Sequence, residues 1–374
     1  MFTPRYSITD KMAQHLMDIQ RASVIVDYLP LPPSVLKKLQ KQSRESTVLL
    51  STKIEGNRLD ERAKRQALYA QSEEGLEQEV FNLMKAIEFL EQAEHRQLPI
   101  TEELIKQLHA VIQVVHGGRR PKFSEYRQAQ NVVGNRNQSG YYMPPEYQDV
   151  PTLMEDLVAW VNSPNSMQIP APIKAGIFMY QFLTIHPYMD GNGRTARMFA
   201  TYLLRKAGLG LKGLFVLETF YDRNLTGYYE SLQMDLHHNY YFGRNDADLT
   251  RWLEFFIEGA ATVFSEVADE VRQLSYEYIS VEPELIRGLD PQQRMVFAQL
   301  AFKRVSLSTT DIRRLLDLSE RTIRDKVKKW IAEGFLVPRD EDAQRIRSVT
   351  LAEKYRKLAE EMEQDLDRYR YLLQ

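Results

Sequence analysis

The chain has 374 residues, of which 43% are hydrophobic and 27% charged. These proportions are typical of a soluble globular protein with two domains or one large domain. The sequence contains no cysteine, which excludes a disulfide framework, a thiol nucleophile and a zinc finger. It shows no apolar run of membrane-spanning length and no export signal, so we expect a cytoplasmic protein without a membrane partner.

The charge is unevenly distributed along the chain. Residues 289–357 carry 16 Lys and Arg against 10 Asp and Glu, a net of +6, which leaves −8 of the total of −2 for the remainder. A basic segment attached to an acidic body indicates two parts with separate roles. We expect N-terminal helices over residues 1–100, a core over 101–280 and a separate module over 289–357.

Apolar residues at helical spacing predict helices at 9–29, 34–56, 79–92 and 101–112. Ser51 and Glu55 are four residues apart and therefore share one face of the last turn of the second helix. Taken alone, this pair is interpreted as two polar residues at a helix end without a functional role. His109 lies among Leu104, Leu108 and Ile112 and is expected to be a packed core residue rather than a ligand.

Two short strand-like runs, 131–133 and 141–143, flank a Gly- and Asn-rich segment and stop at Pro144 and Pro145. This pattern predicts a β-hairpin within about 128–145, with unpaired edges in an otherwise helical protein. It is either a plain loop or a flap to which an extended peptide adds as a strand.

Helices are predicted again at 150–161, on both sides of residues 186–193, and at 222–236 and 249–279. Tyr228 and Tyr229 lie on the first of the last two, where core packing is the usual role of such a pair. His237 and His238 lack companion ligands at metal spacing and are expected at the surface.

The central stretch is His-Pro-Tyr-Met-Asp-Gly-Asn-Gly-Arg-Thr-Ala-Arg, residues 186–197. Its polar groups lie between two helices that are apolar almost all round, so they must satisfy each other or bind a ligand. A calcium loop is excluded because Arg194, Thr195 and Thr201 stand where oxygen ligands and glycine are required. The Gly-Lys-Ser/Thr of a Walker loop is also missing.

An anion site beside a base remains. Gly191 and Gly193 allow close approach of the backbone, and a helix beginning at Arg194 directs free N–H groups at the loop. Asn192 adds a donor, while Arg194 and Arg197 supply positive charge for phosphate oxygens.

Two further residues of this stretch suggest the chemistry. Asp190 is well placed to hold a magnesium ion that bridges phosphates, and His186 can accept a proton from an attacking hydroxyl. The set predicts transfer of a phosphorus-centred group from a nucleotide.

This stretch resembles the His-Pro-Phe-x-Asp/Glu-Gly-Asn-Gly-Arg-x-x-Arg signature of the Fic family, with Tyr188 in place of the common Phe. Glu125-Tyr126-Arg127, the hairpin with Pro144 and Pro145, and the Tyr228–Tyr229 pair also have counterparts in that family. The resemblance covers roughly residues 34–260. It implies a mainly α fold: a Fic-type helical core with a β-hairpin flap.

The common activity of that family is transfer of AMP from ATP to a Ser, Thr or Tyr hydroxyl of a protein, with Mg²⁺. The resemblance implies that His186 is the general base and Asp190 the metal ligand. It places Gly191, Asn192, Gly193, Arg194, Thr195 and Ala196 in the nucleotide site, with Arg197 on the γ-phosphate. Tyr228 and Tyr229 would line the adenine side, and Val132, Val133 and Gly134 would border the site and clamp the target strand.

The resemblance also gives Ser51 and Glu55 a role, because residues 51–56 match the family's inhibitory motif Ser/Thr-x-x-x-Glu-Gly/Asn. Glu55 would pair with Arg197 and compete with the γ-phosphate. The protein is then an autoinhibited adenylyltransferase whose target is another protein or itself. Whether the same Glu also supports AMP removal is left open, as are a homodimer and transfer of UMP or phosphocholine.

Residues 289–357 have the layout of a winged helix-turn-helix domain: helices at 291–302, 310–316 and 320–332, then strands at 334–337 and 346–351 around Asp340-Glu341-Asp342. Arg321, Arg324, Lys328 and Lys329 would project from the recognition helix, although Asp325 dilutes this face. DNA and protein are both open as partners. The alternative function is a nucleotide-sensing, DNA-binding transcription regulator. Residues 358–374 are predicted to form an exposed C-terminal helix.

Overall fold

The computed structural model describes residues 2–70, 75–115, 121–134, 141–281, 283–339 and 346–363. The chain is mainly helical and divides into two compact units. The first comprises Met1–Leu29 and Lys38–Arg272, and the second Pro30–Lys37 and Gln273–Gln374. In the described part of the chain, no helix combines the length and the apolar character that crossing a lipid bilayer requires.

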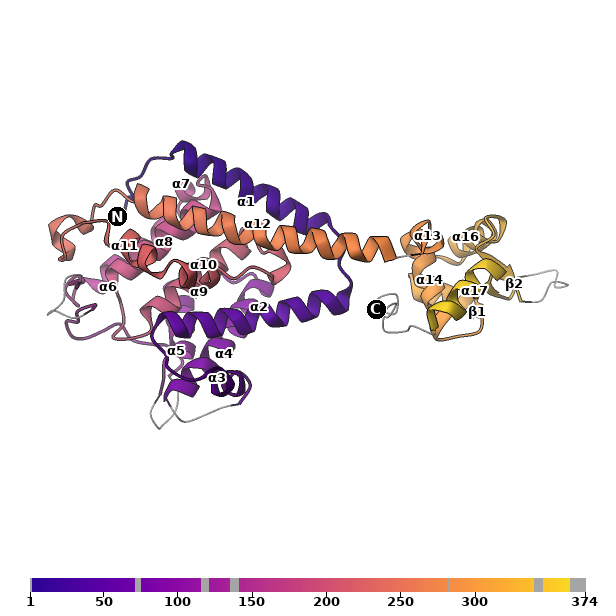
Figure 1. The fold of residues 1–374 in the computed structure, drawn as a ribbon, viewed down its shortest axis with the longest axis horizontal. Helices are drawn as coiled ribbons and strands as arrows, with labels where there is room; N and C mark the ends of the chain where they lie inside the picture. Colours follow the sequence, from indigo (N-terminus) through magenta and orange to yellow (C-terminus); the bar gives the residue numbers. More distant parts are fainter. Residues whose placement is uncertain are drawn as a thin grey trace. The chain divides into compact units, whose positions relative to one another are not determined.

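The helices of the first unit, some shared with the second, follow one another along the chain as shown in Figure 1. They are α1 (Asp10–Tyr28), α2 (Pro33–Ile54), α3 (Glu61–Ala67), α4 (Gly75–His95), α5 (Glu102–Ile112), α6 (Val150–Val161), α7 (Pro164–Met167), α8 (Ala171–Ile185), α9 (Asn192–Lys206), α10 (Glu218–Arg223), α11 (Leu225–Gln233) and α12 (Thr250–Val281), with short helical turns at Leu211–Gly213 and Tyr240–Arg244.

Most predicted helices are confirmed, and their ends follow from local chemistry. Thr9 and Thr101 cap α1 and α5, because their side chains accept hydrogen bonds from the N–H groups of Met12 and Leu104. The single helix predicted at 222–236 is wrong. Asn224 leaves the helical conformation (φ −126°, ψ 41°) and its amide donates to the Phe220 carbonyl, which separates α10 from α11.

The core of the first unit is built around α8 and α9, which pack directly on each other. Nearly every residue of α8 is buried, as expected for a helix that is apolar all round. At Gly176 the helix comes so close to α12 that an added Cβ would lie 2.8 Å from Leu253 and 3.0 Å from Phe256. Trp252 donates its indole N–H to the Gly176 carbonyl at 2.8 Å. The loop between α8 and α9 therefore rises from a rigid base.

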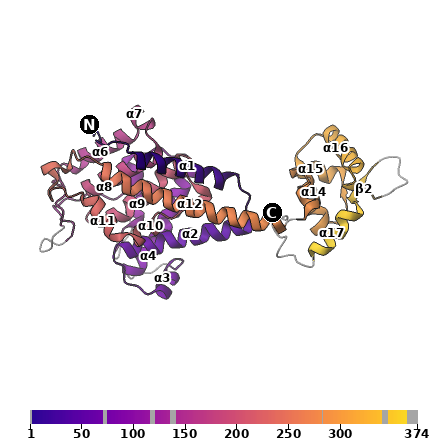
Figure 2. The ribbon, with the colours of Figure 1, turned by 45° about the horizontal axis from the view of Figure 1, so that its top comes forward.

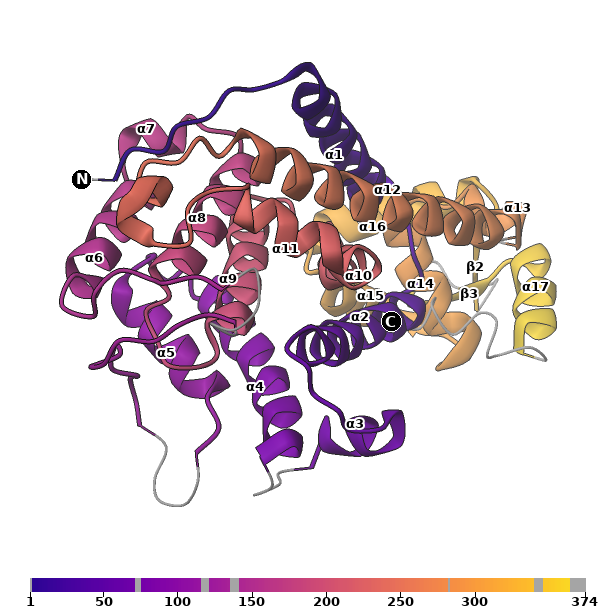
Figure 3. The ribbon, with the colours of Figure 1, turned by 60° about the vertical axis from the view of Figure 1, so that its left-hand side comes forward.

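Two N-terminal helices belong to this unit as well. α1 lies along α12 (Figures 1 and 2), with Thr9 bound to Glu254 at 2.7 Å and Lys11 to Glu258 at 2.6 Å. α2 runs beside α10 (Figure 3), where Lys53 pairs with Asp222 at 2.8 Å. The end of α2 is thus part of the same body as α8 and α9.

The predicted hairpin appears as one antiparallel bridge between Val133 and Tyr142, with N–H to O distances of 2.8 Å in both directions. Residues 135–140 of this hairpin lie outside the described residues. The expectation that both edges are unpaired is wrong. Met143 forms a parallel bridge with Asn239, so the edge at 131–134 is the one left for an added strand.

The second unit contains α13 (Glu284–Arg287), α14 (Pro291–Phe302), β1 (Leu307–Ser308), α15 (Thr309–Leu316), α16 (Glu320–Ala332), β2 (Leu336–Pro338), β3 (Ser348–Leu351) and α17 (Glu353–Glu363). Its helices and strands follow the predicted order. The strands form an antiparallel sheet in the order β1-β3-β2. β1 was not predicted, because two residues are too few to show an alternating pattern. The acidic turn at 340–342 lies outside the described residues.

The C-terminal helix differs from the prediction. It was expected to be exposed over residues 358–374, but α17 begins at Glu353 and buries Tyr355, Ala359 and Met362 in the core of the second unit. These residues are spaced four and three apart, which places them on one helical face. Residues 364–374 of the predicted helix lie outside the described residues.

Gly176→Ala is expected to lower the free energy of unfolding of the first unit by about 1–3 kcal/mol, because the new methyl group cannot be accommodated against Leu253. Denaturant unfolding followed by circular dichroism measures this. Gly210→Ala is the matched control, since its φ is −86° and the nearest atom to an added Cβ is 3.8 Å away. Equal stability of the two variants would contradict the close packing of α8 and α12.

Candidate functional site

The loop between α8 and α9 is held in an unusual backbone conformation. α8 ends at His186 with φ 52°, and Gly191 has φ 78° immediately before α9. A left-handed conformation is costly for histidine, so the surroundings must enforce it. Buried Arg127 does so: its Nε donates to the His186 carbonyl at 3.0 Å and its backbone N–H to the Pro187 carbonyl at 2.9 Å.

Arg127 also connects this loop to the flap. Its guanidinium donates to the carbonyls of Ala129 and Pro145 and to the side chain of Gln130. The Glu125-Tyr126-Arg127 motif thus divides: Tyr126 and Arg127 are buried, and Glu125 is exposed. One arginine fixes both the loop between α8 and α9 and the base of the flap.

The side chain of His186 is arranged to act as a base. Its Nδ1 lies 3.3 Å from the Leu183 carbonyl. A carbonyl oxygen only accepts, so Nδ1 carries the hydrogen and Nε2 keeps a free lone pair. Burial lowers the pKa of His186 to about 4, which leaves the imidazole neutral at neutral pH.

His186 opens into a cavity of about 640 Å³, a size suited to a nucleotide-sized ligand. The cavity is lined by Glu55, Val133, Gly134, Tyr142, Leu183, Thr184, His186, Gly193, Arg197, Tyr228, Tyr229, Leu232, Gln233 and Arg244. Eight of these were predicted site residues, drawn from four separate parts of the sequence. Of the six others, Tyr142 lies in the predicted hairpin, and the remaining five carry no motif that could have marked them. Among them, Arg244 stacks over Tyr142 at 4.7 Å.

Arg197 is the buried cation of this cavity, with a side chain only 1% exposed. Its guanidinium contacts the Glu55 carboxylate at 2.8 Å, the Ser51 hydroxyl at 3.1 Å and the Ser51 carbonyl at 3.2 Å. The predicted ion pair of Glu55 with Arg197 is therefore present, and the two contacts of Ser51 accompany it. A Cβ at Gly193 would lie 2.2 Å from Glu55 Oε1, so this carboxylate rests directly on the glycine loop.

The electrostatics of Arg197 follow from these neighbours. Burial acts to lower the pKa of Arg197, but the effects of Glu55, Tyr228 and Glu218 together outweigh it and raise the pKa above its ordinary value. A second carboxylate, Glu218, also acts on Arg197, and burial raises the pKa of Glu218 itself. Arg197 is thus a permanent cation between one carboxylate from α2 and another that is fully buried.

Six residues of the predicted nucleotide site do not line the cavity: Gly191, Asn192, Arg194, Thr195, Ala196 and Val132. Thr195 and Ala196 are fully buried within α9, which begins at Asn192 rather than at Arg194. The Asn192 side chain does not face a ligand, because it bonds the N–H and the carbonyl of Tyr188 at 3.0 and 2.8 Å. Val132 lies beside Val133 in the flap but outside the lining.

Arg194 and Asp190 form a second charged group beside the loop. Arg194 is buried and pairs with Asp190 at 2.8 Å and with Glu79 at 3.0 Å. Burial acts to raise the pKa of Asp190, but the charge of Arg194 and the Gly191 N–H outweigh it, so this pKa lies below its ordinary value. An ionised carboxylate that is 77% exposed suits Mg²⁺, which takes one or two carboxylates and completes its shell with phosphates and water.

The glycine turn also rests on a residue that we expected only to fill the core. His109 is buried, and its Nε2 lies 2.8 Å from the Asp190 carbonyl. Burial lowers the pKa of His109 to about 4. His237 and His238 have no group of metal ligands around them among the residues described.

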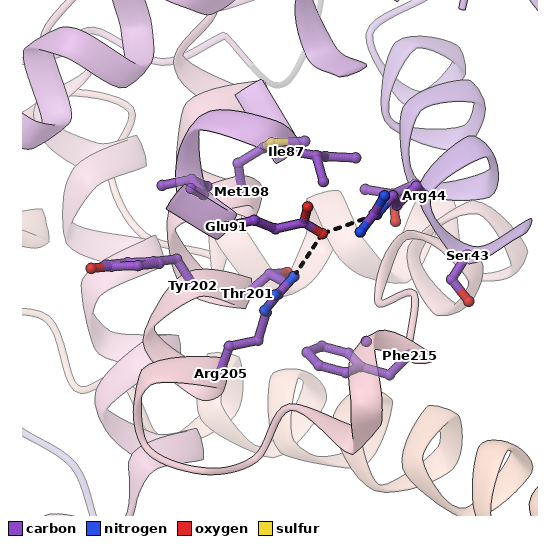
Figure 4. A pocket seen from close by; sticks show the side chains of 12 residues that line it. Ser43, Arg44, Ile87, Glu91, Met198, Thr201, Tyr202, Arg205 and Phe215 are labelled. Carbon is purple, nitrogen blue, oxygen red and sulfur yellow. Dashed lines mark hydrogen bonds and ion pairs between the residues drawn. The ribbon is translucent and has the colours of Figure 1, made fainter. Parts of the chain in front are cut away.

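Further contacts fix α2 against the rest of the unit. Figure 4 shows a small cavity where Glu91 lies between Arg44 of α2 and Arg205 of α9, at 3.0 and 3.6 Å. Ser43 donates to the Leu214 carbonyl, and Tyr229 donates to the carbonyl of Ile54 at the end of α2. The position of Glu55 is therefore determined along the length of the helix.

Together, the fold and the site define a helical protein that presents a neutral histidine beside a glycine loop and a buried arginine. Residues 99–204 match the model of the Fic/DOC family.

Curated relatives are similar over part of this chain. The protein adenylyltransferase Fic of Drosophila virilis is 28% identical over 184 residues, which cover 47% of this chain and 36% of the relative. That of Drosophila sechellia is 29% identical over 134 residues, or 35% of this chain and 25% of the relative. The chain thus matches about a third or less of the length of these relatives.

Solved structures share the fold. A Fic family protein from Desulfovibrio desulfuricans has a TM-score of 0.57 at 22% identity, and the match covers 94% of this chain and 99% of that one. A Fic domain containing signaling protein from Bacteroides thetaiotaomicron also has a TM-score of 0.57, at 19% identity, covering 70% and 97% of the two chains.

Acid is expected to destabilise the protein through its buried histidines. The pKa of His109 is about 4 in the folded chain and 6.5 in the unfolded one, so between these values only the unfolded chain binds the proton. Its contribution is complete above pH 6.5 and falls by about 2 kcal/mol between pH 7 and pH 5. Denaturant unfolding at both pH values should show a smaller loss for His109→Gln than for the native chain. Equal losses would contradict a neutral buried ring.

Proposed function

We propose that this chain is a protein adenylyltransferase, which transfers AMP from ATP to a hydroxyl side chain of a protein. The observation that carries the proposal is the cavity itself, where His186, Gly193 and Arg197 meet the two tyrosines and the flap. The names of the Drosophila relatives support the same reaction.

In this reaction the target hydroxyl oxygen bonds to the α-phosphorus of ATP, the bond to the β-phosphate oxygen breaks, and pyrophosphate leaves. His186 Nε2 takes the hydroxyl proton, for which its free lone pair is suited. The N–H groups in the first turn of α9 lack partners within the helix and are available to the phosphates. Arg197 neutralises negative charge at the far end of the triphosphate.

Asp190 would hold Mg²⁺, which would supply positive charge to the phosphates when bound. Arg194 keeps the Asp190 carboxylate ionised and in place. Mg²⁺ is usually bound by one or two protein carboxylates and takes its other ligands from water and substrate phosphates. A single carboxylate such as Asp190 is therefore enough for a site that the substrate completes.

The remaining lining residues select the substrates. Tyr228 is buried and Tyr229 is 44% exposed, so together they offer one fixed and one adjustable aromatic wall to the adenine. The edge at residues 131–134 is available to main-chain hydrogen bonds from an extended target segment. Hydrogen bonds of this kind recognise the backbone of the target rather than its side chains. A segment of this chain could therefore also serve as the target.

We further propose that this enzyme is held inactive by Glu55. The Glu55 carboxylate occupies the space against Gly193 and Arg197 that the terminal phosphate requires. ATP can then bind only with its phosphates displaced from the position for attack. The enzyme could also use a donor other than ATP and transfer another phosphorus-centred group. The experiment below distinguishes these donors.

The experiment is transfer of label from ATP labelled at the α-phosphate, followed by mass spectrometry for added AMP. Glu55→Gly is expected to raise transfer at least about tenfold over the native chain. Without Glu55, the terminal phosphate can contact Arg197, and one such charged contact is worth about 1.4 kcal/mol or more. His186→Ala in the same background should abolish it.

Glu45→Gln is the matched control, because it removes a carboxylate from α2 at a position that pairs with Lys41 instead of Arg197. It should leave transfer at the native level. If no Glu55 variant transfers AMP, and UTP or CDP-choline gives the added mass instead, the fold retains a transferase of another group. If none of these donors is used, the enzyme proposal is wrong.

A second candidate is supported by the second unit. α16 carries Arg321, Arg324 and Lys328 on one exposed face, and the left-handed turn at Asp317 joins it to α15. Arg324 pairs with Glu320, while within the described residues Arg321 and Lys328 have no ion pair. This is the arrangement with which a helix-turn-helix contacts DNA phosphates. The protein would then be a nucleotide-sensing regulator of transcription.

The full-length chain should in that case bind a labelled DNA duplex with an affinity that falls steeply from 50 to 200 mM salt. Arg321→Ala is expected to reduce the slope of log affinity against log salt by about 1, as measured by fluorescence anisotropy. Lys357→Ala, on α17 and paired with Glu353, is the control. Binding that is absent, or that both variants weaken equally, would remove this candidate.

A further inference from the structure

His109 of α5 forms hydrogen bonds through both of its ring nitrogens, and one of these bonds reaches the glycine turn. Nδ1 lies 2.7 Å from the Ser124 hydroxyl and Nε2 lies 2.8 Å from the Asp190 carbonyl. The ring is 4% exposed, and Ser124 is 3% exposed. A polar connection therefore runs through the core to the backbone of the acidic residue of the loop.

The direction of these hydrogen bonds is determined by their partners. The Asp190 carbonyl can only accept, so Nε2 donates to it. The Ser124 hydroxyl can donate, so it serves Nδ1. Ser124 is itself held in place, because its N–H donates to the Lys106 carbonyl of α5 at 3.1 Å. The ring is thereby fixed in one orientation by two partners that cannot exchange roles.

One face and the edge of the ring also make contacts. One face stacks on Tyr188, with ring centroids 3.6 Å apart and planes 12° apart. The edge approaches Gly191, where an added Cβ would lie 3.1 Å from Nε2 and 3.7 Å from Ile112. His109 thus contacts the loop at Tyr188, Asp190 and Gly191, on both sides of the carboxylate expected to hold the metal.

We propose that His109 is a positioning residue for Mg²⁺: by fixing the Asp190–Gly191 peptide, it sets the direction in which the Asp190 carboxylate projects. This inference rests on the proposed function. Asp190 is 77% exposed, and Arg194 is its only ion pair among the described residues, so its direction depends on that pair and on its own backbone. A peptide plane is rigid, and holding the carbonyl also holds the Cα on which the carboxylate stands.

Loss of the hydrogen bond from His109 to Asp190 should have a different effect from loss of an ordinary core contact. Removing a buried apolar side chain lowers stability but leaves the metal requirement unchanged. Losing a group that orients a metal ligand typically costs 10- to 100-fold in metal affinity or activity. The Mg²⁺ concentration needed for half of the maximal effect is therefore the informative quantity.

The variants are made in the full-length Glu55→Gly background. His109→Gln keeps a donor close to the place of Nε2, whereas His109→Asn keeps a polar group only near Nδ1. We expect His109→Asn to raise the half-maximal Mg²⁺ concentration at least about tenfold, with a smaller loss of rate at saturating Mg²⁺, and His109→Gln to restore most of it. Leu108→Ala, which removes a fully buried neighbour on α5, should lower stability without this shift.

Two readouts are taken on each variant: AMP transfer, and ATP binding by calorimetry at a series of Mg²⁺ concentrations. The proposal is overturned if folded His109→Asn has the same Mg²⁺ requirement as its parent in both, or if Leu108→Ala shifts it equally. If the Glu55→Gly parent transfers no AMP, the proposed function fails. The calorimetric Mg²⁺ dependence of ATP binding still decides the role of His109.

Discussion

A buried arginine is the constraint on which this structure depends. Arg197 is almost completely enclosed between α9, α2 and α11, where an unpaired guanidinium would cost several kcal/mol. It therefore needs an anionic partner. Glu55, at the end of α2, forms an ion pair with it, and the fully buried Glu218 acts to raise its pKa. A terminal phosphate is also negatively charged and also offers acceptor oxygens, so we propose it as the competitor for the place of Glu55.

The rest of the first unit holds this competition in place. α8 and α9 form the rigid base, and Arg127 ties the loop between them to the flap. The helix α2, which ends beside Glu55, is attached at several points: Arg44 and Arg205 share Glu91, and Tyr229 donates to the last carbonyl of α2. Tyr229 also lines the cavity, so a ligand that moves this ring would loosen the end of α2. In the proposed mechanism, nucleotide binding and release of Glu55 would share these contacts.

The sequence predicted the helices and the charged loop well, because both depend on local spacing. The 12-residue motif is contiguous, and Ser51 and Glu55 are four apart on one helix, so their shared faces follow from helical geometry. Other features depend on distant parts of the chain. The side chain of Asn192 closes its own loop, Arg244 and Gln233 line the cavity from a segment without a motif, and His109 looks apolar in its surroundings until Asp190 is brought to it. Periodicity carries no information on such long-range contacts.

The central claim is that Glu55 and the γ-phosphate compete for Arg197, and ADP, which lacks that phosphate, tests it most directly. Calorimetry gives the ratio of the ADP to the ATP dissociation constant for the native chain and for Glu55→Gln, which keeps the shape of the side chain without its charge. We expect this ratio to rise at least about tenfold in Glu55→Gln. Only ATP has the γ-phosphate that can contact the freed Arg197, and this contact is worth about 1.4 kcal/mol or more. An unchanged ratio, with both nucleotides gaining equally or not at all, would contradict it.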